Sequence, residues 1–210
     1  MSFKTPDEKE IQRINRLQQE LFDDIVHLFE PPLPEGVPER LATIVSAAAI
    51  EKGDVVLDVG TGTGILVPLI RQYGPGRFYA CDLSRKMLRQ LRKNYIGVKT
   101  ILSDVRDLAL PEESIDAVFI NACYPNIADK AGAFANLARM MRPGGRLVIS
   151  HPLGKRFVET LKKSASFPLD DFPARSEAAR LLAPYGFAIR FFVDEPQLYI
   201  LVAVRQIRTD

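Results

Sequence analysis

A glycine-rich loop carries the clearest chemical meaning in this sequence. Gly60, Gly62 and Gly64 alternate directly after the apolar run Val55–Val59. Glycine lets the backbone turn tightly and lets a ligand approach the main chain closely. The N–H groups of such a loop, and of a helix that begins after it, suit the charged part of a nucleotide. The spacing therefore predicts a nucleotide-type site, without saying which nucleotide.

An acid at the end of the second apolar run narrows the kind of site. A carboxylate at Asp82 can accept hydrogen bonds from both hydroxyls of a ribose. The dinucleotide fingerprint G-x-G-x-x-G would place a third glycine at the sixth position from Gly60. Ile65 stands there, and the third glycine comes one residue earlier, at Gly64. The loop departs from the dinucleotide pattern, but Asp82 also suits NAD, so an NAD(P)-dependent oxidoreductase stays an alternative.

Short apolar runs that alternate with helical segments must position these residues. Five such runs predict strands at Val55–Val59, Phe78–Asp82, Val98–Leu102, Ile115–Ile120 and Arg146–Ser150. Alternation of this kind is typical of a parallel sheet with helices on both faces. Phe187–Val193 and Leu198–Gln206 are separated by a short link and predict an antiparallel hairpin. We expect a doubly wound α/β fold with a seven-stranded, mostly parallel sheet and an antiparallel C-terminal hairpin strand.

The N-terminal region predicts a helical cap. Thr5 is a candidate N-cap and Pro6 a candidate first helical residue. Apolar residues then recur at helical spacing, at Ile11, Ile14, Leu17, Leu21, Ile25 and Leu28. Prolines between Pro31 and Gly36 end this helix, and a second helix is expected from about Pro38 to Ile50. We expect a single domain over residues 1–210, with a cap over 1–50 and a core over 51–210.

In these motifs the chain resembles the class I (Rossmann-like) methyltransferases that use S-adenosylmethionine (SAM), in the part that includes ubiquinone/menaquinone-type and other small-molecule enzymes. The resemblance covers about Pro38 to Arg205. It rests on segments that match the family in order and spacing: Val55–Gly64, Cys81–Ser84 followed by Met87-Leu88, Ser103–Val105, Asp116–Asn121 and Leu137–Ser150. The antiparallel final hairpin also fits.

The resemblance implies SAM as the cofactor, with S-adenosylhomocysteine (SAH) as its product. It implies that the loop glycines reach the methionyl end of SAM, that Asp58 steadies the loop or the ammonium group, that Asp82 holds the ribose, and that Asp104 holds the adenine amino group. The predicted cofactor-binding residues are Asp58, Gly60, Thr61, Gly62, Thr63, Gly64, Asp82, Leu83, Asp104, Val105 and Asn121. An aspartate at a strand end can also serve only as a helix cap or turn former.

The acceptor side has weaker candidates. Methyl transfer from a sulfonium needs in-line approach of a nucleophile, and a general base only if the acceptor arrives protonated. His151 closes the fifth strand and is the best candidate for a base near neutral pH. Tyr124 is the candidate for lining the acceptor pocket. The alternatives are a strand-end histidine bonded to backbone and a half-buried loop aromatic. His27 and Tyr199 are further pocket candidates.

The segment Asn121–Tyr124 keeps a second acceptor class open. It partly resembles the N/D-P-P-Y motif of methyltransferases that act on amino groups of nucleic acids and proteins, but Ala122 and Cys123 occupy the two proline positions. An N-methyltransferase of nucleic acid or protein is therefore an alternative, and a non-catalytic SAM-binding protein is another. Cys123 itself is interpreted as a small apolar filler.

The composition limits the classes of partner that the chain is expected to bind. The 28 Lys and Arg against 26 Asp and Glu give a net charge of +2, too slight to indicate nucleic acid. The basic segment Arg85–Lys93 is interpreted as a solvated helix face. We expect a small-molecule acceptor, no metal site, no membrane span and a reduced, cytoplasmic setting with two unpaired cysteines. The sequence does not indicate an oligomeric state.

Overall fold

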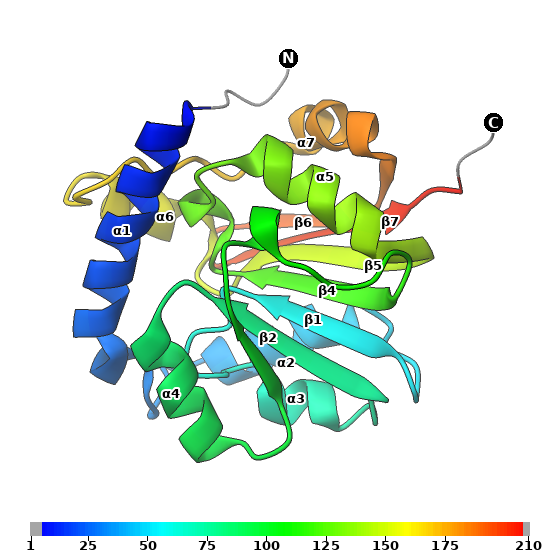
Figure 1. Ribbon diagram of the computed structural model, residues 1–210, viewed down its shortest axis with the longest axis horizontal. Coiled ribbons are helices and arrows are strands. Elements are labelled where there is room, and N and C mark those ends of the chain that lie inside the picture. The colour runs from blue at the N-terminus through cyan, green and yellow to red at the C-terminus, as the bar shows by residue number, and fades with distance from the viewer. Residues whose placement is uncertain (1–5, 208–210) are drawn as a thin grey trace.

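The structure is a computed structural model that describes residues 6–207, and it has helices on both faces of one sheet (Figure 1). The strands are β1 Val55–Val59, β2 Arg77–Asp82, β3 Lys99–Leu102, β4 Ile115–Asn121, β5 Met141–His151, β6 Phe187–Glu195 and β7 Leu198–Arg205. The α-helices are α1 Glu8–Asp24, α2 Val37–Ser46, α3 Val67–Arg71, α4 Arg85–Asn94, α5 Lys130–Met140, α6 Gly154–Lys162 and α7 Arg175–Leu182. Short 3-10 helices are η1 Val26–Phe29, η2 Val105–Asp107, η3 Tyr124–Asn126 and η4 Ala183–Tyr185.

The strand order is β3-β2-β1-β4-β5-β7-β6. Strands β1 to β5 pair in parallel, whereas β7 runs antiparallel to both β5 and β6. The order reverses between β1 and β4, which is the switch point at which α/β sheets bind ligands beyond their carboxyl ends. The predicted fold class, a seven-stranded mostly parallel sheet with an antiparallel C-terminal hairpin, is confirmed.

Alternate residues of the central strands enter two different apolar layers. Val56 and Phe119 pack with α2 and α3 residues on one face of the sheet. Leu57 and Val118 pack with α5 residues on the other. Because both faces are buried, the strands read as continuous apolar runs in the sequence, which is why they could be predicted.

Helix α1 begins and ends differently from the prediction. It starts at Glu8, and Asp7 is the N-cap, with its side chain accepting a hydrogen bond from the Glu10 N–H at 2.9 Å. Proline 6 therefore lies before the helix, and Thr5, the predicted cap, lies outside the described residues. The helix ends at Asp24, so the apolar stripe does not continue to Leu28, which is 67% exposed.

Other boundaries shift because of local backbone geometry. Helix α2 stops at Ser46, before Ala49 adopts a positive φ of 47°. Helix α3 begins at Val67 rather than Ile65, because Gly64 at φ 92° is followed by a turn. Strand β5 is longer than predicted, running from Met141 to His151.

Candidate functional site

The glycine loop is folded back onto the end of β2. The N–H groups of Gly60 and Thr61 both donate to the Cys81 carbonyl, at 2.8 and 3.1 Å. The next glycine, Gly62, donates its N–H to Asp82 Oδ2 at 2.8 Å. The loop conformation is thus fixed by the neighbouring strand, and the predicted ribose residue is joined to the loop directly.

Two of the loop glycines are required for different reasons. Gly60 has φ 65°, and a side chain there would collide with Cys123, so contact with the residues after β4 requires glycine. Gly62 has φ 56°, but a Cβ there would meet nothing within 4 Å. The backbone at Gly62 therefore borders open space, which is what close approach of a ligand needs. Cys123 is the small filler that the sequence suggested.

Asp58 lies beneath this loop. Its side chain is 2% exposed, and Oδ2 accepts a hydrogen bond from the Thr61 hydroxyl at 2.7 Å. Burial raises the pKa of Asp58 to about 7; the Thr61 hydrogen bond opposes this shift, and the nearby charge of Asp82 adds to it. The carboxyl is consequently poised to ionise when a cationic group arrives.

The Asp82 carboxylate joins β2, the glycine loop and α4. Oδ1 accepts the N–H of Ser84 at 2.8 Å, while Oδ2 accepts that of Gly62. Burial raises the pKa of Asp82, and hydrogen bonds from the backbone of Ser84, Gly62 and Leu83 oppose the rise. A carboxylate has about four lone-pair sites. Its fixed orientation therefore leaves acceptor capacity for a ribose.

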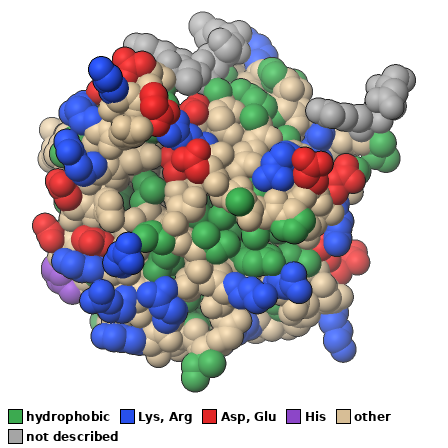
Figure 2. All heavy atoms as spheres, viewed as in Figure 1, with side chains coloured by type: hydrophobic (Ala, Val, Ile, Leu, Met, Phe, Trp, Pro, Cys, Tyr) green, Lys and Arg blue, Asp and Glu red, His purple; other side chains and the backbone are tan. Residues whose placement is uncertain are grey.

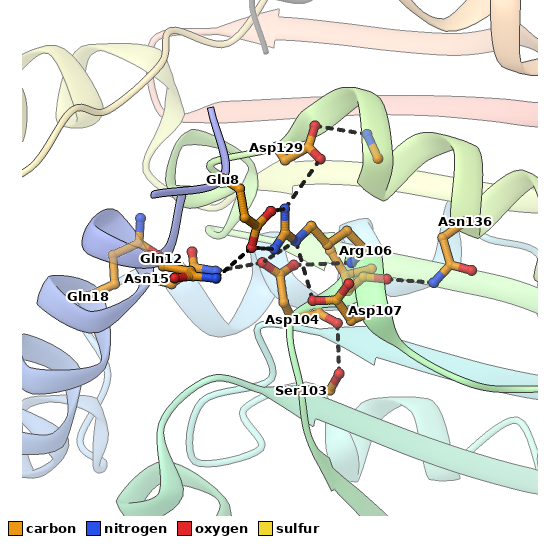
Figure 3. A network of polar contacts seen from close by, with 12 residues as sticks. Glu8, Gln12, Asn15, Gln18, Ser103, Asp104, Arg106, Asp107, Asp129 and Asn136 are labelled. Carbon is orange, nitrogen blue, oxygen red and sulfur yellow. Dashed lines mark hydrogen bonds and ion pairs between the residues drawn. The ribbon is translucent and has the colours of Figure 1, made fainter. Parts of the chain in front are cut away.

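The predicted adenine residue Asp104 is already in contact with α1 (Figure 3). Oδ2 accepts a hydrogen bond from Asn15 Nδ2 at 2.6 Å, and Oδ1 accepts the Arg106 N–H at 3.1 Å. Val105 follows at the start of η2, with its carbonyl bonded to Asn136 Nδ2 at 2.8 Å. An adenine amino group would donate to Asp104 alongside Asn15, or would displace the Asn15 side chain from Asp104. The sequence interpretation missed Asn15.

Further polar contacts fasten α1 across the carboxyl ends of the strands (Figures 1 and 3). Arg106 forms a two-point ion pair with Glu8, with both N–O distances at 2.8 Å. Gln18, which is 2% exposed, donates to the Asn126 carbonyl at 2.6 Å. A polar Gln18 within an apolar helical stripe was a sign in the sequence that this helix meets a polar partner.

The end of α1 and the segment after it continue this cover. Asp23 accepts a hydrogen bond at 2.5 Å from the hydroxyl of Ser84, which lies just after β2. The Phe29 carbonyl accepts one from the Thr63 hydroxyl at 2.9 Å, in the loop after β1. Residues 8–29 therefore contact the segments that follow β1, β2, β3 and β4, over the predicted cofactor residues.

Tyr124 does not line an open pocket. Its side chain is 3% exposed, its ring stacks on Phe172 with centroids 5.4 Å apart, and Lys130 Nζ lies 4.7 Å from the ring centroid. Burial raises the pKa of the hydroxyl. The cavity beside it has a volume of about 10 Å³. This geometry favours a packing role over the predicted catalytic one, which stays a hypothesis.

His151 is held as a neutral ring. Its Nδ1 accepts the Leu153 N–H at 3.1 Å, and burial lowers its pKa to about 4. In a neutral imidazole whose Nδ1 accepts, Nε2 carries the proton. His151 can therefore donate a hydrogen bond through Nε2, but the geometry does not favour the predicted general base. The ring lies between Phe157 and Phe172, with centroids at 5.4 and 5.8 Å.

The remaining candidates lie in different surroundings. Asn121 is buried at the end of β4, and its Oδ1 accepts the Ser150 hydroxyl at 3.0 Å, which does not favour an N/D-P-P-Y role. Tyr199 is fully buried and donates to the Pro173 carbonyl at 3.0 Å. His27 is exposed on η1. Residues 6–207 contain no cluster of His, Cys, Asp or Glu that could hold a metal. No helix in the same range is long and apolar enough to cross a membrane.

Comparisons with known proteins agree with this geometry. Residues 57–149 match a family model described as a methyltransferase domain. The chain is 35% identical over 115 residues to the demethylmenaquinone methyltransferase of Tropheryma whipplei (strain Twist), covering 52% of this chain and 46% of that protein. It is 35% identical over 98 residues to the malonyl-[acyl-carrier protein] O-methyltransferase of Yersinia pestis, covering 47% and 36%. The chain thus spans less than half the length of these relatives.

A solved structure supports the fold over a longer range. The magnesium protoporphyrin IX methyltransferase of Synechocystis PCC 6803, solved with bound SAH, superposes with a TM-score of 0.70 at 18% identity, covering 92% of this chain and 100% of that one. Residues 57–149 thus match the methyltransferase domain family, and the sheet order and the glycine loop resemble those of the class I (Rossmann-like) SAM-dependent methyltransferases.

Proposed function

We propose that this chain transfers a methyl group from SAM to a small-molecule acceptor by direct displacement. The observation that carries the proposal is the hydrogen bond from the Gly62 N–H to Asp82, which sets a carboxylate suited to ribose hydroxyls beside a loop that borders open space. SAM supplies an electrophilic methyl group on a sulfonium when bound. The demethylmenaquinone methyltransferase and the malonyl-[acyl-carrier protein] O-methyltransferase among its relatives support an acceptor of this class.

The charges around the loop suit a ligand with cationic and donor groups. Asp58 is buried and Asp82 is half-buried, and burial raises the pKa of each. In addition, Glu30 Oε1 is buried and has no hydrogen-bond partner among residues 6–207; Glu30 follows Phe29, whose carbonyl accepts the Thr63 hydroxyl. The ammonium group at the methionyl end of SAM would donate hydrogen bonds to these acids, including one to Glu30 Oε1.

The residues of the chain have separate tasks in this proposal. Gly60, Gly62 and Gly64, with Thr61 and Thr63, form the loop at the methionyl end. Asp82 and Leu83 hold the ribose end, and Asp104 with Val105 holds the adenine. Of the predicted cap, residues 8–29 act as a cover that excludes water, whereas α2 packs on one face of the sheet. His151 donates a hydrogen bond to the acceptor, and alignment and water exclusion supply much of the rate.

Calorimetric titration tests the cofactor, and turnover tests the acceptor. We expect SAH to bind and NADH not to bind; tight NADH binding without SAH binding would contradict the proposal. Turnover of SAM to SAH is then measured with a panel of hydroxylated, amino and carbon-acid small molecules, and with bulk RNA and protein. Methylation of RNA or protein alone would assign the chain to the N-methyltransferase alternative. SAH binding with no turnover on any acceptor would support a non-catalytic SAM-binding protein.

A further inference from the structure

The excess of positive charge in the chain lies in one stretch. From Arg71 to Thr100 the sequence has eight Lys or Arg and a single acid, Asp82, although the net charge of the whole chain is only +2. The rest of the chain is therefore net acidic. All eight cationic residues are exposed: Arg71, Arg77, Arg85, Lys86, Arg89, Arg92, Lys93 and Lys99. We call these residues, together with Ile96, the basic face.

Helix α4 provides most of the basic face. Met87, Leu88 and Leu91 are buried and pack toward the sheet, so the five cations of the helix lie on the opposite side. Figure 2 shows Lys and Arg side chains gathered over the lower part of the molecule, where Figure 1 places α4. The cations therefore form a surface rather than scattered positions.

Most of these charges have no acidic partner. Among residues 6–207, Lys86 alone of the eight has a carboxylate within 4.0 Å, that of Asp24 at 3.7 Å. Three of the others donate to neutral oxygens: Arg71 to the Ile96 carbonyl, Arg77 to the Tyr79 hydroxyl and Arg92 to the Thr100 hydroxyl. These bonds orient the guanidinium groups without neutralising them, which leaves the face strongly positive.

An apolar tip rises from this positive surface. Ile96 is 89% exposed, the highest value among the exposed large apolar residues that the structure describes. It lies in the turn between α4 and β3, with Lys93 before it and Lys99 after it. Beside this turn is a groove of about 430 Å³ whose charged lining residues are Arg71, Arg77 and Lys99. At this exposure the Ile96 side chain contributes little to the packing of residues 6–207.

We propose that the basic face binds a membrane surface containing anionic phospholipids, with Ile96 inserted among the lipids. Lys and Arg near such a surface each gain electrostatic attraction, and an apolar side chain gains by leaving water. Nucleic acid fits less well, because single strands bind by stacking on free aromatic rings. The neighbouring rings already carry cations: Tyr79 has Arg77 and Lys99 at 6.0 and 5.9 Å, and Tyr95 has Arg71 at 6.0 Å.

This binding does not depend on which acceptor is methylated, or on catalysis at all. Ile96, Arg77 and Lys99 lie at the amino ends of β2 and β3, and Arg71 ends α3, whereas the cofactor residues lie at the carboxyl ends, where α4 begins. Failure of the proposed function would therefore leave the membrane contact intact, and the reverse also holds.

Vesicle sedimentation with the full chain tests the proposal. Phosphatidylcholine vesicles with and without phosphatidylglycerol are compared at low and high salt. We expect binding only to the anionic vesicles, and weaker binding at high salt. Ile96→Ser should reduce vesicle affinity roughly tenfold, and the pair Arg92→Glu and Lys93→Glu by roughly tenfold or more. The matched controls Ile207→Ser and Lys163→Glu, at exposed positions outside the basic face, should bind as the wild type does.

The melting temperature and SAH affinity of each variant show that it is folded. The proposal is overturned if the wild type does not bind anionic vesicles, or if Ile96→Ser binds them unchanged. Single-stranded RNA or polyglutamate is tested at the same salt concentration. If either binds more tightly than the vesicles and ignores Ile96→Ser, the face belongs to a polyanion and not to a membrane.

Discussion

The two halves of the carboxyl edge of the sheet are lined by different kinds of group. At the ends of β1, β2 and β3, backbone N–H groups and acids hold one another, as between Gly62 and Asp82. At the ends of β4 and β5, aromatic rings are packed together, with Phe172 between Tyr124 and Tyr199 at centroid distances of 5.4 and 4.6 Å. The first half presents polar groups to a ligand, while the second leaves little room for one in this conformation. The first half therefore offers hydrogen-bonding groups to the methyl donor, whereas the role of the second half in binding the methyl acceptor is tested by activity measurements.

The largest effect is expected at Asp82. In Asp82→Ala the ribose loses its acceptor and the Gly62 N–H loses its partner, so SAH affinity should fall well beyond tenfold, to roughly a hundredfold weaker. Isothermal calorimetry measures this. Glu112→Ala, an exposed acid in the turn before β4, is the control and should bind normally. Near-wild-type affinity of Asp82→Ala would contradict the ribose assignment.

A substitution at Gly60 tests whether the two halves of the carboxyl edge are coupled through the packing of Gly60 against Cys123. Gly60→Ala places a Cβ at φ 65° and against Cys123, so the free energy of unfolding should fall by about 2–4 kcal/mol. Denaturant unfolding measures the change. In the double variant with Cys123→Gly the collision is relieved, so relative to Cys123→Gly alone the Gly60→Ala change should cost only the backbone term of about 1–2 kcal/mol. Strictly additive effects would show that the contact with Cys123 is unimportant.

The donor half could be predicted because its parts are local in sequence. Gly60, Gly62 and Gly64 need only the backbone geometry of one loop, and Asp82 needs only the end of a buried strand. The sheet was predictable for a similar reason, since burial on both faces imposes apolar runs. The shift of α3 from Ile65 to Val67 reflects a turn that the glycine pattern alone does not specify.

The cap and the acceptor half could not be predicted in the same way. The Asn15–Asp104 contact joins residues 89 positions apart, and periodicity says nothing of such a pair. Tyr124 and His151 were recognised as residues that can do chemistry, but their burial depends on Phe172, which lies in an irregular segment. Their roles depend on tertiary packing and not on motif spacing.

A substitution at His151 tests the half of the carboxyl edge at the ends of β4 and β5. We expect His151→Ala to lower turnover roughly tenfold or more, because a hydrogen-bond donor is lost, while SAH affinity stays unchanged. His27→Ala, at the exposed second histidine, is the control. Because the pKa of His151 is lowered to about 4, its neutral form persists from pH 6 to 8 and should give turnover no slope there. A slope that His151→Ala abolishes would instead indicate a base.

Asp58 gives the smallest effect and the most specific one. Its pKa is raised from 3.8 to about 7, so the folded chain binds more protons than the unfolded chain between these values. The free energy of unfolding without ligand should therefore fall as pH rises from about 4 to 7. SAH brings an ammonium group that favours the ionised carboxylate, so its affinity should rise severalfold, up to about tenfold, between pH 6 and 8.

The opposite signs of these two slopes separate Asp58 from acids whose pKa is lowered and from acids remote from the ligand, and Asp58→Asn separates it from Asp82, whose pKa is also raised by burial. An acid whose pKa is lowered by folding would make stability rise with pH, and an acid remote from the ligand would leave affinity flat. Thermal unfolding and calorimetry across the range measure both slopes. In Asp58→Asn both contributions should vanish together, since the amide cannot ionise. If affinity keeps its slope in that variant, the ammonium group is held elsewhere, with Glu30 and its unpaired oxygen as the next residue to change.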